Sequence, residues 1–146
     1  MSPRERGKQV HRLLSQLPDR AAWPGVRTVL EADAGLGATD VRNLVADVER
    51  VLALPSLAPF FEPGSEVHTE RAFAGSEGQI FIPDRLIRTP TGWAVLDFKT
   101  GKPRPSDEAQ VAGYMRQIAQ IETGEVTGWI CYLESGTCMA VQAQLF

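Results

Sequence analysis

Two charged residues stand out because they lie in a segment that otherwise predicts a buried strand. Residues 93–99 read Trp-Ala-Val-Leu-Asp-Phe-Lys, a run that is nearly apolar on both faces, as in a central strand of a sheet. Side chains alternate along a strand, so Asp97 and Lys99 point to the same face. Burying such charges is costly unless each one has a partner. This pair is therefore the first candidate for chemistry.

A hairpin would bring a second carboxylate to this pair. A Thr-Pro-Thr-Gly turn at residues 89–92 joins two segments of strand composition. If the first and last residues of the turn pair, Asp84 lies opposite Asp97, with about 5 Å between the Cβ atoms. A register slip of one residue, such as a glycine bulge introduces, would send Asp84 to the other face.

Two carboxylates this close repel each other, which invites a cation between them. Oxygen ligands of this kind suit magnesium, which keeps several waters and also contacts substrate phosphate. The alternative is purely structural: Asp97 and Lys99 form an ion pair, and Asp84 pairs with Arg85 or Arg88. Spacing alone leaves both interpretations open.

Helices are expected on both sides of this hairpin in the sequence. Apolar residues at helical spacing predict helices over residues 4–17, 26–34 and 40–52, and from residue 106 onward. Thr39 or Asp40 would cap the third helix, and Ser106 would cap the fourth. The fourth helix would carry an apolar stripe that includes Val111 and Met115.

Segments rich in β-branched and aromatic residues, separated by Gly and Pro turns, predict the strands. They cover residues 66–74, 79–88, 93–100, 126–133 and 138–145. The helix between the third and fourth strands permits a parallel crossover. We therefore expect one α/β domain over residues 1–146, with a mixed sheet of about five strands flanked by helices. Residues 1–60 would be mainly helical, and residues 61–146 would form the catalytic sheet and its helix.

Composition limits the classes of function. The 146 residues contain neither a secretory signal nor an apolar run long enough for a bilayer, so we expect a cytoplasmic protein with no membrane partner. There is no G-x-x-x-x-G-K-[ST] phosphate loop, so the chain alone should not hydrolyse ATP.

The distribution of charge bears on nucleic-acid binding. A net charge of −3 argues against a general nucleic-acid coat protein, so any DNA binding must be local. Positive charge gathers near the start and around residue 100: Arg4, Arg6, Lys8 and Arg12, then Lys99, Lys102 and Arg104. Taken alone, each group is as well explained by a solvated charged face.

Several short motifs follow one another in a specific order. They are Gly7-x-x-x-His11, Glu70 ahead of Phe73, Ile-Pro-Asp-Arg-Leu at 82–86, Asp-Phe-Lys-Thr-Gly at 97–101, and Gln110-x-x-x-Tyr114. In order and spacing they resemble the nuclease domain of RecB and AddA type helicase-nucleases, in the PD-(D/E)XK superfamily. The resemblance runs from residue 7 to about residue 114 and implies a restriction-endonuclease-like fold.

The resemblance also implies roles for individual residues. His11, Asp84 and Asp97 would hold a divalent ion, the Phe98 carbonyl would complete the site, and Lys99 would act in catalysis. A lone histidine on an amphipathic helix is more often a bystander. The glycine one turn earlier on the same face, however, would leave room for the catalytic sheet to approach.

Three further residues belong to this candidate catalytic set. Gln110 and Tyr114, one helical turn apart, would hydrogen-bond Lys99 or a DNA phosphate, or would form only a polar rim above the apolar stripe. Glu70 would orient Lys99 or a metal-bound water, or would be an exposed strand residue.

By this resemblance the chain is expected to be a Mg²⁺-dependent deoxyribonuclease, an exonuclease or an endonuclease, in which Mn²⁺ substitutes for Mg²⁺. Its substrate would be DNA, as single strands or duplex ends, and its partners would be the helicase domains or subunits of a double-strand break repair enzyme. Two alternatives stay open. One is a free-standing nuclease acting on junctions, tRNA or phage DNA, and the other is an inactivated fold serving as a DNA-binding or assembly module.

Overall fold

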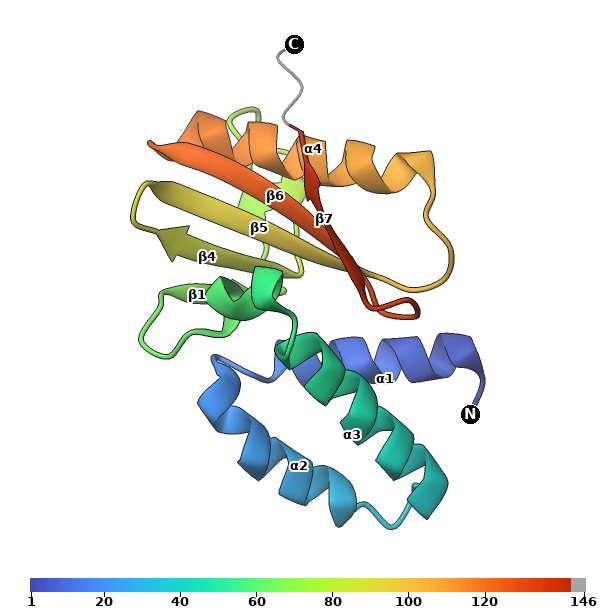
Figure 1. Cartoon of the computed structure of the whole chain (residues 1–146). Helices are drawn as coiled ribbons and strands as arrows, with labels where there is room; N and C mark the ends of the chain where they lie inside the picture. The colour runs from blue at the N-terminus through green and yellow to red at the C-terminus, as the bar shows by residue number, and fades with distance from the viewer. Residues whose placement is uncertain (143–146) are drawn as a thin grey trace.

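The computed structural model describes residues 1–142 of the chain. A central sheet separates two groups of helices (Figure 1). On one face lie α1 (Pro3–Ser15), α2 (Trp23–Glu31) and α3 (Ala38–Leu52), with the short 3-10 helices η1 (Arg20–Ala22) and η2 (Pro55–Phe61). The single helix α4 (Pro105–Ile121) covers the other face. The predicted helical N-terminal part and the later crossover helix are thereby confirmed.

The main sheet has five strands in the order β1-β4-β5-β6-β7. Their bounds are β1 Val67–Thr69, β4 Arg85–Thr89, β5 Gly92–Lys99, β6 Glu125–Tyr132 and β7 Thr137–Val141. Among the strand pairs within residues 1–142, only β5–β6 is parallel, and α4 forms the crossover between these two strands. The expected mixed sheet of five strands, flanked by helices as in restriction endonucleases, is confirmed.

The register of the β4–β5 hairpin decides which side chains meet. Thr89 pairs with Gly92 and the ladder continues to Arg85 opposite Leu96, with no bulge. The next step of the same register places Asp84, just before β4, beside Asp97. The predicted hairpin register is therefore confirmed.

Two predicted strands are wrong as continuous elements. Residues 66–74 divide into β1 and β2 (Phe73–Ala74), and residues 79–88 divide into β3 (Ile80–Phe81) and β4. Glu70 adopts φ 49°, a left-handed conformation that ends β1. Pro83 lacks an N–H group for the ladder, which favours the break before β4. β2 and β3 pair with each other as a separate two-stranded sheet.

The predicted helix caps also need correction. α3 begins one residue before Thr39, with Gly37 as N-cap and no side-chain cap. α4 begins at Pro105 with Arg104 as N-cap, so Ser106 lies inside the helix. The carboxylate of Asp107 accepts the free N–H of Arg104 at 2.9 Å. The last strand, predicted over residues 138–145, is described from Thr137 to Val141. Residues 143–145 of the predicted span lie outside the described residues.

A buried arginine joins the N-terminal helices to the sheet. Arg85 is 1% exposed, and its guanidinium donates to the backbone carbonyls of Phe60 (2.7 Å), Leu14 (3.4 Å) and Pro18 (3.0 Å). It also lies 4.1 Å from the ring centroid of Phe61. Burial lowers its pKa to about 10. These contacts tie the end of α1 and the η2 segment to β4, so they fix how α1 approaches the sheet.

None of the helices in the described part of the chain is long and apolar enough to cross a membrane. The apolar residues instead form two cores, one on each face of the sheet. In β5 the even-numbered residues from Ala94 to Phe98 pack toward the N-terminal helices, and Trp93 and Val95 pack toward α4.

Candidate metal centre

Asp84 is held at the start of β4 by backbone contacts on both sides. Its carbonyl accepts the N–H of Glu70 at 3.0 Å, and its carboxylate Oδ2 accepts the N–H of Phe98 at 2.8 Å. The alternative in which Asp84 pairs with an arginine is wrong. Arg85 points to the opposite face and binds carbonyls, and Arg88 lies over the ring of Trp93.

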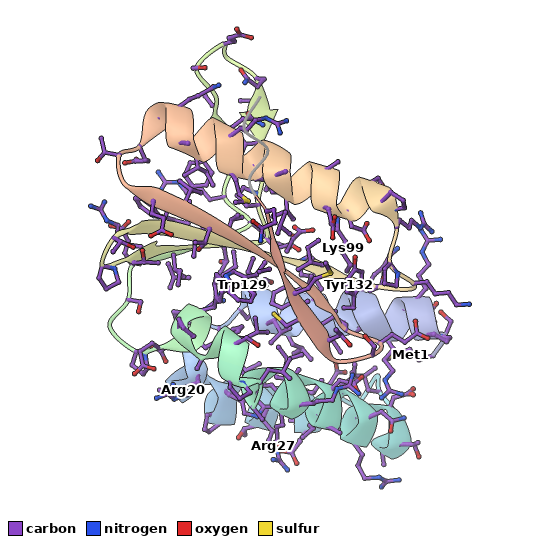
Figure 2. All side chains as sticks on the ribbon, turned by 45° about the horizontal axis from the view of Figure 1, so that its top comes forward. Met1, Arg20, Arg27, Lys99, Trp129 and Tyr132 are labelled. Carbon is purple, nitrogen blue, oxygen red and sulfur yellow. The ribbon has the colours of Figure 1, made fainter. Side chains whose placement is uncertain are left out.

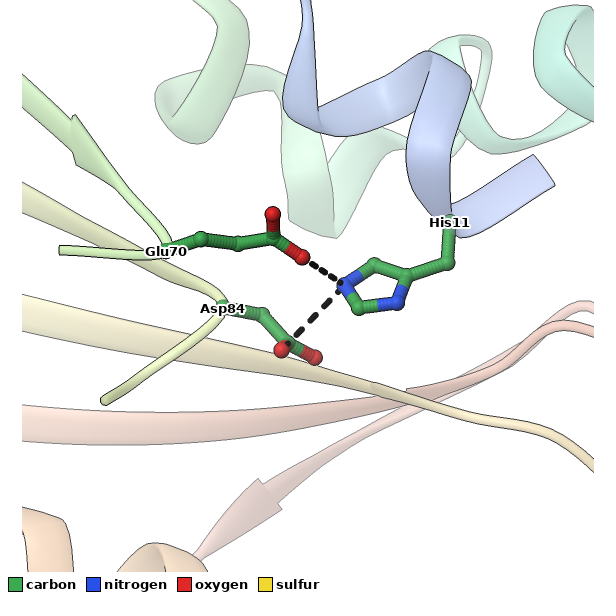
Figure 3. A group of neighbouring side chains, drawn as sticks. All are labelled: His11, Glu70 and Asp84. Carbon is green, nitrogen blue, oxygen red and sulfur yellow. Dashed lines mark ion pairs between the residues drawn. The ribbon is translucent and has the colours of Figure 1, made fainter. Parts of the chain in front are cut away.

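His11, Glu70 and Asp84 form a compact group, which we call the His11 cluster (Figure 3). His11 Nε2 lies 3.2 Å from Oε1 of Glu70 and 3.2 Å from Oδ1 of Asp84. One ligand atom from each residue lies within 4.8 Å of the others. Segments far apart in the sequence thus bring one imidazole and two carboxylates to a single point.

The His11 ring nitrogen provides a test of whether a cation fits here. Nε2 is buried and lies at ion-pair distance from both carboxylates, although neither contact has the geometry of a hydrogen bond. These contacts are favourable only when the imidazole is protonated, whereas a cation shared with the two carboxylates would also satisfy a neutral imidazole. The carboxylates suit magnesium or manganese, and the imidazole beside them suits a transition metal better than magnesium. The residues present therefore fit a divalent ion.

Asp97 lies beside this cluster and is 3% exposed. Burial, and then the negative charge of Asp84, raise its pKa to about 7. Burial would also raise the pKa of Asp84, but the contacts with His11 and the Phe98 N–H outweigh it and hold that pKa below its usual value. The predicted pair of carboxylates is thus brought together, and the two carboxylates compete for one proton.

Lys99 links Asp97 to helix α4. Its Nζ lies 2.8 Å from Oδ2 of Asp97 and donates a hydrogen bond to Oε1 of Gln110. The amide of Gln110 in turn donates to the hydroxyl of Tyr114 at 3.0 Å. Figure 2 shows Lys99 near the N-terminal end of α4. The Asp97–Lys99 ion pair, which a purely structural role predicts, is therefore present. It lies next to Asp84, the second acid that a metal site requires.

Gly7 allows α1 to approach the end of β5. A Cβ atom on Gly7 would lie 2.2 Å from Cγ2 of Thr100, the residue after Lys99. Such a distance is far below van der Waals contact, so another residue here would displace the helix or the strand end. The predicted close approach of α1 to the sheet at Gly7 is confirmed. This approach brings His11 within reach of Asp84.

The structure brings together most of the residues that the sequence singled out. His11, Asp84 and Asp97 converge as expected, whereas Glu70 contacts His11 rather than Lys99. Phe98 contributes its N–H to Asp84, and a metal-binding role of its carbonyl stays a prediction. Sequence reasoning missed the structural role of Arg85, whose only signal was a charge next to the apolar pair Leu86 and Ile87 at the buried start of β4.

The sheet order, the helices on both faces and the acids on adjacent strands define a restriction-endonuclease-like α/β domain. Residues 1–133 match the PD-(D/E)XK nuclease superfamily, and the chain belongs to this superfamily. A solved structure, the crystal structure of SSO0001, is similar with a TM-score of 0.40 and 14% identity, covering 93% of this chain and 68% of the other. No curated protein sequence matches the chain.

Proposed function

We propose that the chain is a metal-dependent deoxyribonuclease that hydrolyses phosphodiester bonds at the His11 cluster. Membership of the nuclease superfamily supports a nuclease in general. The observation that carries the metal dependence is the convergence of one ligand atom each from His11, Glu70 and Asp84, with the buried Asp97 beside them. Lys99 pairs with Asp97, but His11 balances Asp84 and Glu70 only when its ring is protonated, so a divalent ion could take that place.

His11, Asp84 and Asp97 are the proposed ligands of Mg²⁺ or Mn²⁺, with Glu70 and the Phe98 carbonyl as further oxygen donors. The ion, when bound, would polarise the scissile phosphate and lower the pKa of a bound water. The protein contributes a rigid arrangement, since Asp84 is fixed to the β5 backbone through the Phe98 N–H.

Lys99 is the proposed catalytic cation. It lies on the same strand face as Asp97, and its ammonium is held between Asp97 and Gln110. In this position it would orient the attacking water and stabilise the negative charge that develops on the phosphate. Gln110 and Tyr114 would act as positioning residues, because Gln110 contacts the Lys99 ammonium and Tyr114 in turn contacts Gln110.

The test compares the unaltered chain with Asp97→Ala and Lys99→Ala on linear DNA in Mg²⁺ or Mn²⁺. Asp97→Ala should abolish metal binding and cleavage together. Lys99→Ala should retain metal binding but reduce the cleavage rate at least about 10²- to 10³-fold. Asp33→Ala, which removes an exposed carboxylate from the turn after α2, is the matched control and should cut normally. Equal cleavage by the unaltered chain and Asp97→Ala would overturn the proposal.

At a finer level, we infer a relationship to the nuclease domains of RecB and AddA type helicase-nucleases. The support is the order of motifs from Gly7-x-x-x-His11 to Gln110-x-x-x-Tyr114, together with the contact of Gly7 with Thr100 that the first motif requires. A domain fed by a helicase should degrade linear single strands or duplex ends. Preferential cleavage of junctions or structured RNA would favour a free-standing structure-specific nuclease instead.

The non-enzymatic alternative is an inactivated fold that binds DNA or assembles with partners. Asp84, Asp97 and Lys99 are all present, and Asp97 interacts with both of the others, which counts against it. DNA binding without cleavage in either metal, and without any thermal stabilisation by metal, would favour it.

A further inference from the structure

A groove of about 1120 Å³ runs from His11 and Lys99 toward the first residues of the chain. One wall is the N-terminal half of α1, and the other is the segment from Thr100 to Arg104 that leads into α4. We propose that this groove binds the phosphates of a single DNA strand and that α1 sets their positions relative to the scissile bond. The inference rests on the proposed function and adds the path of the substrate.

The groove is positively charged although the chain as a whole carries −3. Its lining includes seven cationic side chains and three carboxylates: Arg4, Arg6, Lys8, Arg50, Lys99, Lys102 and Arg104, with Asp47, Asp107 and Glu134. The two positive groups of the sequence therefore face one space, apart from Arg12. Phosphate binding draws its affinity from such local cations.

Most of the acids in the lining are already engaged. Asp47 accepts two hydrogen bonds from Arg6, and Asp107 accepts one from the hydroxyl of Tyr132 at 3.0 Å. By contrast, the ion pairs found within residues 1–142 include neither Arg4 nor Lys8 on α1, and neither Lys102 nor Arg104 on the other wall. These four exposed cations remain available to a polyanion.

The spacing along α1 suits successive phosphates. Arg4, Lys8 and His11 follow an i, i+4, i+7 pattern and share one face of the helix. At 1.5 Å per residue, Lys8 lies about 4.5 Å and Arg4 about 10.5 Å from His11 along the axis. Phosphates of a stacked strand advance about 3.4 Å each. A strand leaving the His11 cluster along α1 would thus pass Lys8 first and Arg4 second.

The dimensions favour one strand over a duplex. The volume is slightly above the roughly 300–1,000 Å³ of small-molecule pockets, which leaves room for a few nucleotides of one strand. Cations lie on both walls, and the walls meet where Gly7 contacts Thr100.

Figure 2 shows Met1 and Lys99 on one side of the molecule, away from Arg20 and Arg27, which pair with glutamates.

The test is fluorescence anisotropy of a labelled single-stranded oligodeoxynucleotide with the full chain in EDTA, at several salt concentrations. Arg4→Gln/Lys8→Gln should weaken binding and lower the slope of log Kd against log salt by about 1.4, from about 0.7 per lost phosphate contact. Lys102→Gln/Arg104→Gln on the second wall should have a similar effect. Arg42→Gln/Arg116→Gln, with the same change in charge at exposed positions outside the groove, should leave the slope unchanged. Melting curves should be the same for all variants, since every altered residue is exposed.

Equal slopes for the α1 variant, the second-wall variant and the control would overturn the proposal. A duplex of the same sequence that binds more tightly and loses the same slope would overturn its single-strand part. In steady-state cleavage, the α1 variant should raise KM and leave kcat unchanged. If the chain binds DNA through these cations but never cuts it, the proposed function is wrong and the binding groove is supported. If the chain cuts DNA with no dependence on the four cations, the binding groove is wrong and the proposed function is supported.

Discussion

Arg85 and Asp97 are both buried charges on neighbouring strands, yet their surroundings differ in kind. Arg85 donates to three backbone carbonyls and packs on an aromatic ring, so its hydrogen-bonding groups are satisfied without a carboxylate partner. Asp97 is buried next to another carboxylate, and its pKa is raised to about 7. Close to it, His11 Nε2 lies 3.2 Å from two carboxylate oxygens, with the geometry of a hydrogen bond to neither.

The comparison distinguishes Arg85, a buried charge that stabilises the fold, from the charges around Asp97, which are arranged as ligands of a cation. In the Arg85 region, each guanidinium nitrogen donates to a backbone carbonyl, and these bonds join α1, η2 and β4. The region around the His11 cluster contains repulsion between acids, a ring nitrogen whose carboxylate contacts require it to be protonated, and the left-handed backbone of Glu70. Strain of this type persists where the surrounding structure enforces it, and it concentrates at functional sites.

The largest effect on stability should come from Arg85→Met. The substitution removes the Arg85 donors from the carbonyls of Phe60 and Pro18, while Leu14 keeps a backbone donor, so the free energy of unfolding should fall by about 2–5 kcal/mol, at about 1–3 kcal/mol for each lost bond. Chemical denaturation measures it. Arg88→Met is the control: its guanidinium is exposed and only stacks on Trp93, so it should cost no more than about 1 kcal/mol. Similar losses for both variants would show that Arg85 does not hold the two elements together.

A smaller effect is expected from Gly7→Ala. Alanine normally favours a helix over glycine by about 0.5–1 kcal/mol. Here its Cβ would collide with Thr100 Cγ2, and overpacking of this kind costs about 1–3 kcal/mol. Metal affinity should fall as well, because α1 carries His11. Adding Thr100→Ser, which removes the colliding methyl group, should restore part of both losses. A stabilised Gly7→Ala variant with normal metal affinity would contradict the close approach.

The smallest effect should be a dependence of metal-free stability on pH. The pKa of Asp97 is raised to about 7 by burial and Asp84, and the pKa of His11 is raised mainly by Asp84. In both cases the folded state binds a proton more tightly than the unfolded state. Their contribution is therefore fully present below the unfolded pKa values and is lost as pH rises through the folded ones.

In EDTA, the melting temperature should accordingly fall by roughly a few degrees as pH rises from about 5 to 8. Asp97→Asn should flatten this decline, because it removes the group with the larger shift. Thermal melts at several pH values measure both. A melting temperature that rises over the same range would mean that the acids are stabilised without a cation.

Much of the fold was predictable because its signals are local. The turn at residues 89–92 determined the hairpin register, and the apolar period in α1 determined which face is buried. From that register alone, the convergence of Asp84, Asp97 and Lys99 followed. The breaks at Glu70 and Pro83 were missed because both segments keep the composition of strands across them.

Other parts of the site depend on tertiary packing and leave little trace in the sequence. Arg85 reaches carbonyls from two distant segments, Leu14 and Phe60, which no spacing reveals. Glu70 meets His11 only because α1 packs across the ends of the strands. Similarly, the two positive groups face one groove because Gly7 lets α1 contact the segment after β5. The sequence shows the charges of both groups, but it does not show that they lie along the same groove.

Melting temperatures of the unaltered chain and of Asp97→Asn at pH 8, with and without Mn²⁺, show whether the buried acids bind a cation. If the acids are assembled for a cation, Mn²⁺ at 100 times its Kd should stabilise the unaltered chain by about 2.7 kcal/mol. Asp97→Asn should melt higher than the unaltered chain in EDTA and gain little from Mn²⁺. A metal-free variant no more stable than the unaltered chain, or an equal response of both to Mn²⁺, would contradict the account.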